Sequence, residues 1–220
     1  MSRPARKTAP AAPAPVTAPA TPEPSSRQRA LIAALALFDA QGVAATTLEQ
    51  VRDAADISVG SLYHHFGSRE GLIAALYEDL LERYRAVLAP ALAQCDDARA
   101  LLDAFTATHI GWAVAHPAAA RFLARHRHDP ALQPAEAKLQ AGTADFLQPL
   151  LMRLKPAVTT GAIRALPPEL LLSLVVGPVQ AWLQQWFDGR TGQKPATAAR
   201  RLADLIWAAL AMPAGQRPRN

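Results

Sequence analysis

The sequence predicts an all-α protein, and three observations support this prediction. Apolar side chains recur at helical spacing in nearly every segment after residue 25. The segments are separated by prolines and glycines, which end helices, and no run alternates apolar and polar residues as a half-buried strand does. With 220 residues, 50% of them hydrophobic, the chain can bury a sizeable core in one domain or two.

Residues 1–24 are expected to form a disordered arm. They are mainly proline, alanine and threonine, and they lack the large apolar side chains whose burial offsets the entropy lost on ordering. The arm serves either as a solubilising leader or as a grip on a polyanion through Arg3, Arg6 and Lys7. Residues 213–220 are expected to form a flexible tail.

The expected compartment is the cytoplasm. The lone Cys95 excludes an intramolecular disulfide framework, and the arm lacks the continuous apolar core of a secretion signal. The longest apolar run, residues 170–179, is well short of the ~20 residues that a membrane span needs. No membrane partner is therefore expected.

A first helix is predicted from Ser25 or Ser26 to Gln41, with Gly42 as its stop. Its length and position suit a support behind the segment that follows. Its apolar face comprises Leu31, Leu35 and Phe38.

Residues 46–72, TTLEQVRDAADISVGSLYHHFGSREGL, describe two short helices at a sharp turn with a third helix behind them. Thr47 can cap the first, whose apolar positions fall at helical spacing, and Asp56 stands where the chain must turn. Ser58 is placed to cap the second helix, which opens with small residues that can approach base edges closely. The third begins at Ser68. This is the build of a DNA-reading helix-turn-helix.

At these residues the chain resembles the TetR family of bacterial transcriptional regulators, over a long ungapped stretch. Two positions depart from the family pattern: Arg52 replaces a small alanine between the two helices, and Asp56 replaces the turn glycine. A left-handed backbone at Asp56 would cost roughly 1 kcal/mol relative to glycine. Arg52 must bend outward, toward DNA or toward Asp56. The matching positions are Thr47, Val51, Ala55, Ile57, Ser58, Gly60, Leu62, Tyr63, His65, Phe66, Ser68, Arg69, Glu70 and Leu72.

The resemblance implies a three-helix DNA-binding domain at residues 25–71 and an all-helical ligand-binding and dimerisation domain at residues 72–212. It implies phosphate contacts from two side chains of the second helix and backbone anchoring from two helix starts. The alternative for the tyrosine is simple packing. The expected phosphate contacts are Tyr63 and His65, the anchors are Thr47 and Arg69, and the base contacts are Val59, Gly60, Ser61 and His64.

The formal net charge of +5 supports only a weak attraction to polyanions. Between residues 25 and 71 the basic residues are outnumbered, so the predicted reading head is not a basic patch. Phosphate contacts must come from a few placed side chains, from helix N-termini or from the arm. The residues are Arg27, Arg29, Arg52 and Arg69 against Asp39, Glu49, Asp53, Asp56 and Glu70.

Helical patterns continue after Ser68. A long helix carries the stripe Leu72, Leu76, Leu80 and Tyr84 and is expected to kink near Pro90. Further helices are predicted over residues 97–116, 118–126, 134–154, 168–187 and 196–212.

The last two predicted helices carry the case for a homodimer, because in the family such helices pair with their copies in a four-helix bundle. Their apolar faces would serve equally well as monomer core. A symmetric pair of heads would recognise a palindromic operator in double-stranded DNA. The faces comprise Leu171, Leu174, Val175, Pro178, Trp182 and Trp186 in one helix, and Leu202, Leu205, Ile206, Ala209 and Leu210 in the other.

Between the head and these helices, aromatic residues interleave with alanines that leave room for a small apolar effector. The same aromatics would suit a plain core. His109 is the candidate polar contact of a ligand, or else a core histidine with its hydrogen bonds satisfied. The candidate pocket residues are Phe105, His109, Trp112, Phe122 and Phe146.

A histidine-rich turn, RHRHDP at residues 125–130, raises a metal or enzyme hypothesis. His126, His128 and Asp129, with His116 upstream, are side chains that bind zinc or nickel. The flanking arginines and the proline favour a solvated connection, and no serine elbow, phosphate loop or paired-carboxylate pattern stands out. We therefore expect no catalytic residue, no metal and no cofactor.

The sequence thus predicts a ligand-responsive regulator, a homodimeric repressor released from a palindromic operator by a small apolar molecule. Ligand entry is expected to shift the helix that begins at Ser68 and so change the separation of the two reading helices. One alternative is a protein of the same fold that acts through a protein partner. The other is a metal-binding protein or enzyme that uses His116, His126 and His128.

Overall fold

A computed structural model describes residues 23–212, which fold into nine α-helices and one 3₁₀-helix. The one extended pairing among them is a bridge between Ile163 and Ala211, so the all-α prediction is confirmed. The predicted tail and all but two residues of the predicted arm lie outside the described residues. The elements are α1 (Ser26–Gln41), α2 (Leu48–Ala55), α3 (Val59–Phe66), α4 (Arg69–Ala93), α5 (Ala98–Ala115), α6 (Pro117–His126), η1 (Pro130–Ala135), α7 (Glu136–Thr159), α8 (Pro168–Phe187) and α9 (Pro195–Leu210).

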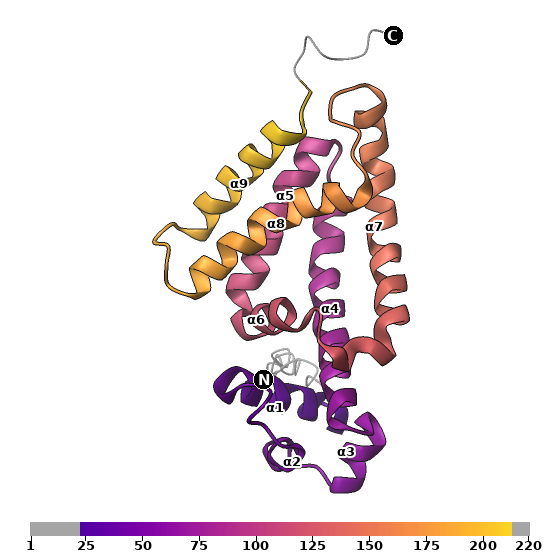
Figure 1. Cartoon of the computed structure of the whole chain (residues 1–220), viewed down its shortest axis with the longest axis vertical. Coiled ribbons are helices and arrows are strands. Elements are labelled where there is room, and N and C mark those ends of the chain that lie inside the picture. Colours follow the sequence, from indigo (N-terminus) through magenta and orange to yellow (C-terminus); the bar gives the residue numbers. More distant parts are fainter. Residues whose placement is uncertain (1–22, 213–220) are drawn as a thin grey trace, which may run out of the picture.

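The molecule has a small head, formed by α1, α2 and α3, at one end of a larger helical body, formed by α4 to α9 (Figure 1). α4 belongs to both parts, because it begins against α3 and then runs through the body beside α5 and α7. α5 lies at the centre of the body and contacts α4, α6, α8 and α9. α6 lies at the end of the body nearest the head and contacts α1, so it joins the two parts a second time.

The first four helices begin at residues that the sequence marks. Ser25 and Thr47 start α1 and α2 within reciprocal capping boxes. Ser58 and Ser68 each accept a hydrogen bond from the backbone N–H three residues further on, at the starts of α3 and α4. These caps fix the chain directions in the head. Its core is continuous with the base of α4 and is built from Leu31, Phe38, Val51, Leu62, Phe66, Leu72 and Leu76.

The body helices follow the predicted segments with one main difference. The helix expected over residues 134–154 starts at Glu136, after η1, and continues to Thr159 through Pro149 and Pro156. Each proline removes one backbone donor, and the turns on either side carry the helix past it. No residue of α7 is fully buried, so it forms an outer layer. None of the described helices is both long and apolar enough to cross a membrane.

Candidate nucleic-acid interface and ligand cavity

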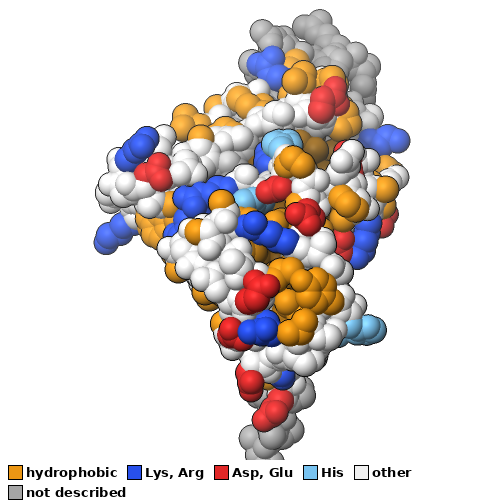
Figure 2. Space-filling view, turned by 60° about the horizontal axis from the view of Figure 1, so that its bottom comes forward, with side chains coloured by type: hydrophobic (Ala, Val, Ile, Leu, Met, Phe, Trp, Pro, Cys, Tyr) orange, Lys and Arg blue, Asp and Glu red, His pale blue; other side chains and the backbone are white. Residues whose placement is uncertain are grey.

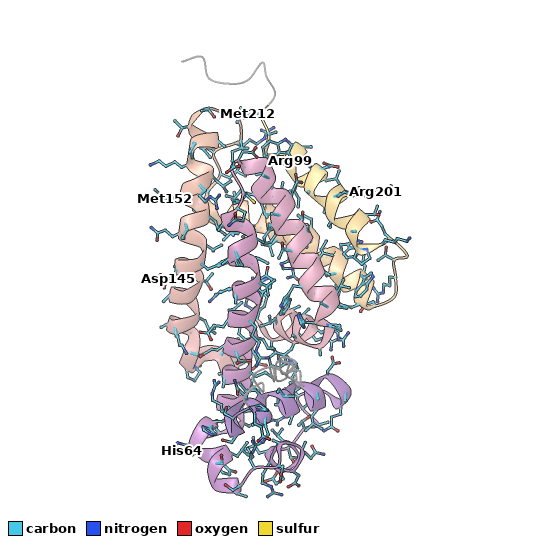
Figure 3. All side chains as sticks on the ribbon, turned by 180° about the vertical axis from the view of Figure 1, so that it is seen from behind. His64, Arg99, Asp145, Met152, Arg201 and Met212 are labelled. Atoms are coloured by element: carbon cyan, nitrogen blue, oxygen red, sulfur yellow. The ribbon has the colours of Figure 1, made fainter. Side chains whose placement is uncertain are left out.

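α3 buries one face in the head and exposes the other. Leu62 and Phe66 lie in the core, whereas Val59 and Tyr63 are each 50% exposed. His64 lies at the outer edge of the head, away from the body (Figure 3). Gly60 is exposed beside them and Ser61 is half-buried. Val59, Gly60, Tyr63 and His64 of α3 are therefore exposed to solvent, and Ser61 is partly so.

The turn before α3 has the left-handed backbone that the sequence suggests. Asp56 has φ 49° and ψ 60° and ends α2. Arg29 of α1 holds this turn, because its guanidinium donates to the carbonyls of Ala55 at 3.1 Å and Asp56 at 3.3 Å. This role of Arg29 could not be predicted from the sequence, because a bond from a side chain to a distant backbone carbonyl leaves no sequence pattern. Arg52 pairs with the adjacent Asp53, not with Asp56.

Two of the expected DNA contacts are engaged inside the head. The Arg69 guanidinium donates to the carbonyl of Val43, and its Nε is buried without a partner. This engagement favours a structural role for Arg69 over the expected anchoring of DNA, which a DNA-binding measurement decides. His65 is half-buried, and its Nε2 lies 2.9 Å from Oγ of Ser26, at the start of α1. Both side chains position α1, α3 and α4 relative to one another.

Thr47 also has a structural role, because its side chain caps α2. Its hydroxyl accepts from the backbone of Gln50 at 3.2 Å, and its own N–H donates to the Gln50 side chain at 2.9 Å. The residue nevertheless remains exposed on the head. Its position at a helix start is the one expected of a backbone anchor.

The helix N-termini of the head differ in whether an acidic side chain already offsets the positive end of the helix dipole. Glu49 and Glu70 occupy the first turns of α2 and α4, where hydrogen bonds from the backbone N–H groups lower the pKa of each carboxyl. α3 has no acidic residue in its first turn, so its N-terminal dipole is unopposed there. Charges of both signs intermingle on the face shown in Figure 2, where the head end is turned forward.

The body contains a cavity of about 720 Å³ with a mainly apolar wall. It is lined by α4 to α9, and four of the five predicted pocket residues contribute: Phe105, His109, Trp112 and Phe146. Phe122 does not line it, which corrects the prediction. Its ring stacks on Phe38 of α1 with the centroids 5.9 Å apart, so it packs between head and body.

His109 is the polar centre of the cavity wall. It is 7% exposed, and its burial lowers its pKa from 6.5 to about 4, so the ring is neutral at pH 7. The Gln180 amide nitrogen lies 3.1 Å from Nε2 and can only donate, so Nδ1 carries the proton and donates to the Tyr84 oxygen. The Tyr84 hydroxyl can then donate to a guest.

α7 forms one side of the cavity, although its residues are only partly buried. Phe146, Leu150 and Leu154 line the cavity from α7. Polar contacts hold the helix to α4 along its length: Lys138 to Glu78, Arg85 to Thr143 at 2.7 Å, and Arg153 to the Leu92 carbonyl at 2.6 Å.

The residues of the predicted dimer faces divide into four groups. Leu171 and Val175 line the cavity, while Trp182 and Ile206 are buried in the core of their own chain, which corrects their assignment to a partner-facing surface. Leu205 is 68% exposed and Ala209 is exposed beside it on α9. Helical periodicity defines an apolar face but not which neighbour covers it. Leu174, Pro178, Trp186 and Leu202 are partly exposed.

The histidine-rich turn is tied together by its own contacts. Nδ1 of His126 lies 2.8 Å from Oδ2 of Asp129, whose other oxygen accepts from Ala131 at the start of η1. His116 packs on Trp112 instead. Between residues 23 and 212, no three His, Cys, Asp or Glu side chains come together as a metal site would require.

Comparison with known proteins agrees with this architecture. A family model described as bacterial regulatory proteins, tetR family, matches residues 30–76. The HTH-type transcriptional repressor KstR2 of Rhodococcus jostii (strain RHA1) is 40% identical over 86 residues, which are 37% of this chain and 40% of that repressor. The match thus spans about two fifths of the length of this relative.

Two solved structures share the fold across both parts of the molecule. A TetR family transcription regulator from Marinobacter aquaeolei VT8 has a TM-score of 0.74 at 20% identity, over 86% of this chain and 96% of that one. The transcriptional regulator FadR from Bacillus subtilis, in complex with stearoyl-CoA, has a TM-score of 0.70 at 13% identity, over 82% of this chain and 97% of FadR.

Proposed function

Because this chain belongs to the TetR family of bacterial regulatory proteins, we propose that it is a transcriptional repressor that leaves its DNA when a small, largely apolar molecule enters the body. The observation that carries the proposal is a solvent-facing α3 and a large apolar cavity joined by one helix, α4. The repressor KstR2, which is 40% identical over 86 residues, supports the DNA-binding half of the proposal.

Recognition would use the exposed side of α3 in the major groove. Val59 is suited to a thymine methyl group, and Ser61 can exchange hydrogen bonds with more than one base. Tyr63 and His64 stand beside them and would contact phosphates and base edges. The unopposed N-terminus of α3 would face the polyanion, and Thr47 would contribute from the start of α2.

The working form would be a homodimer on a palindromic operator. The exposed Leu205 and Ala209 of α9, with the partly exposed Leu174, Pro178 and Leu202, are apolar side chains that a second copy would cover. Pairing of α8 and α9 with their copies would fix the separation of the two α3 helices, and hence the half-site spacing.

Release would follow from two contacts between cavity and head. α4 carries Tyr84 in the cavity wall and begins beside α3, so displacement of one end moves the other. Arg121 of α6 lies against Phe187, which also lines the cavity, and binds Asp39 of α1. A changed separation of the α3 helices would no longer match the ~34 Å repeat of the groove.

The effector is proposed to be apolar over most of its length, because the cavity wall is. The complex of FadR with stearoyl-CoA supports a long acyl chain as one such guest. Tyr84 and Gln180 would supply the polar contacts on either side of His109.

The test is selection of binding sites from random double-stranded DNA by the purified full chain, with and without stearoyl-CoA. The expected result is enrichment of an inverted repeat bound by two copies, with weaker retention when the ligand is added. Enrichment of no sequence at low salt would contradict DNA recognition. Enrichment of a single half-site by one copy would contradict the dimer.

A further inference from the structure

Two arginines stand in the wall of the cavity, and no acidic side chain does. Arg85 comes from α4 and Arg127 from the end of α6, and the remaining lining residues are apolar, aromatic or uncharged. Among the ion pairs of the described residues, none includes either arginine. The cavity therefore carries a positive charge that its own wall does not neutralise.

The surroundings of these arginines form one corner between α4, α6 and α7. Arg85 is half-buried and donates to Thr143 of α7 at 2.7 Å. It lies so close to Gly142 that a Cβ there would come within 2.9 Å of Nη1. Arg127 is exposed and stands at the mouth.

The charges of both guanidinium groups influence the pKa of one side chain, Tyr77 of α4. Burial raises the pKa of the Tyr77 phenol, and the charges of Arg127 and then Arg85 oppose this effect. Glu82, the acid that acts on Arg85, is exposed and outside the cavity wall. No acidic side chain of the cavity wall therefore supplies a counter-charge on the inner side of the corner.

We propose that this cationic corner, formed by Tyr77, Arg85, Arg127 and Thr143, binds the anionic end of an amphiphile whose apolar body fills the rest of the cavity. The proposal rests on the proposed function, because it concerns the same cavity. Guanidinium groups recognise carboxylates and phosphates with paired hydrogen bonds, and a partly desolvated guanidinium is stabilised by an anion that enters beside it. A neutral or cationic guest of equal length is discriminated against.

The corner also sets the direction of the guest. It lies at the end of the cavity nearest the head, where α6 and the start of α7 meet α4 (Figure 1). The wall beyond it is mainly apolar and includes Leu92, Leu154 and Leu210. The charged end is therefore held next to α6, the helix that contacts α1.

The test uses the full chain without DNA and four probes of one chain length. Dodecanoate, 1-dodecanol, dodecyltrimethylammonium and dodecanoyl-CoA are titrated by calorimetry, with CoA alone as a further arm. Dodecanoate or dodecanoyl-CoA should bind roughly tenfold more tightly than dodecanol, and the cation more weakly still. The tighter of the two anionic probes identifies a carboxylate or a phosphate as the preferred group.

Arg85→Gln and Arg127→Gln should each weaken the anionic probe roughly tenfold while the affinity for dodecanol stays unchanged. Arg83→Gln is the matched control, because Arg83 is on α4, pairs with Asp79 and does not line the cavity. If Arg85→Gln fails to fold, Arg85→Lys replaces it in the test. The lysine keeps the positive charge at the half-buried position, so this variant should keep the preference for the anionic probe.

Equal affinity for dodecanoate, dodecanoyl-CoA and dodecanol would overturn the proposal, as would an unchanged anion affinity in both glutamine variants, or no binding of any probe. No DNA is present in these titrations. If the probes show no charge preference, the proposal of the cationic corner fails but DNA recognition is unaffected. If the operator selection enriches no sequence, DNA recognition fails but a measured charge preference is unaffected.

Discussion

Arg121 of α6 binds both carboxylate oxygens of Asp39 of α1, at 3.0 and 2.7 Å. The same guanidinium lies 5.4 Å from the ring centroid of Phe187, which lines the cavity. Beside it, Phe122 stacks on Phe38. One side chain thus contacts the head and a residue of the cavity wall, independently of α4.

Loss of either partner of this pair should destabilise the chain by about 1 kcal/mol, because both side chains are only 28% exposed and the pairing is bidentate. Asp39→Asn, Arg121→Gln and the double variant form a cycle measured by urea unfolding. The double variant should lose less than the sum of the single losses. Strictly additive losses would show that the contact contributes nothing.

Tyr63→Ala should weaken binding to specific and random duplexes alike by roughly tenfold, because a phosphate contact carries no sequence information. Ser61→Ala should instead change the preferred base at particular operator positions. Fluorescence anisotropy on the selected operator and on random DNA separates the two effects. Met152→Ala, at an exposed site on the outer side of α7 (Figure 3), is the control and should leave both affinities intact.

Arg69→Ala should lower the free energy of unfolding by about 1 kcal/mol. The loss is modest because the Val43 carbonyl also accepts from the backbone of Thr46 at 3.2 Å and is not left unpaired. Chemical denaturation gives this value, and DNA affinity well below the unfolding transition should fall little. A large fall in affinity at unchanged stability would assign Arg69 to the phosphate backbone after all.

Acid should destabilise the fold through His109. Its pKa is lowered from 6.5 to about 4 in the folded chain, so the unfolded chain binds the proton more readily. The contribution of the neutral ring is complete above pH 6.5 and falls as the pH drops toward 4, by about 3 kcal/mol in all. Urea unfolding across this range should show a steeper loss in the wild type than in His109→Leu. Parallel curves would refute this assignment.

Asp56→Gly should stabilise the head by up to about 1 kcal/mol, because glycine adopts the left-handed conformation at φ 49° without a Cβ penalty. The greater freedom of glycine in the unfolded chain limits the gain. Thermal unfolding measures the change, and Asp53→Gly, inside α2, should have the opposite sign. A lower transition temperature for Asp56→Gly would mean that the aspartate side chain supports the turn.

Features set by neighbours in the chain were readable from the sequence. Ser58 and Ser68 mark the starts of α3 and α4, because a capping side chain bonds to the backbone within one turn. Asp56 marks the left-handed turn, because that conformation is also a local property of the chain. Apolar spacing on helices that face one space also suggested four of the aromatic residues that line the cavity, namely Phe105, His109, Trp112 and Phe146.

Features set by distant partners were not readable. The position of Phe122 depends on Phe38, and that of Arg69 on the Val43 carbonyl, and neither partner is implied by local spacing. Leu171 and Ile206 lie on apolar faces as predicted, but packing alone decides that one faces the cavity and the other the core. The cationic corner was missed because Arg85 and Arg127 converge from different helices.

No side chain of α7 is fully buried, yet several of them line the cavity. Because α7 contributes no fully buried side chain of its own, we expect it to be the side of the body with the lowest local stability. A guest would add the apolar contacts that α7 lacks. Backbone amide hydrogens along α7 should therefore exchange with solvent sooner than those of α5 in the empty protein, and occupancy should slow them most.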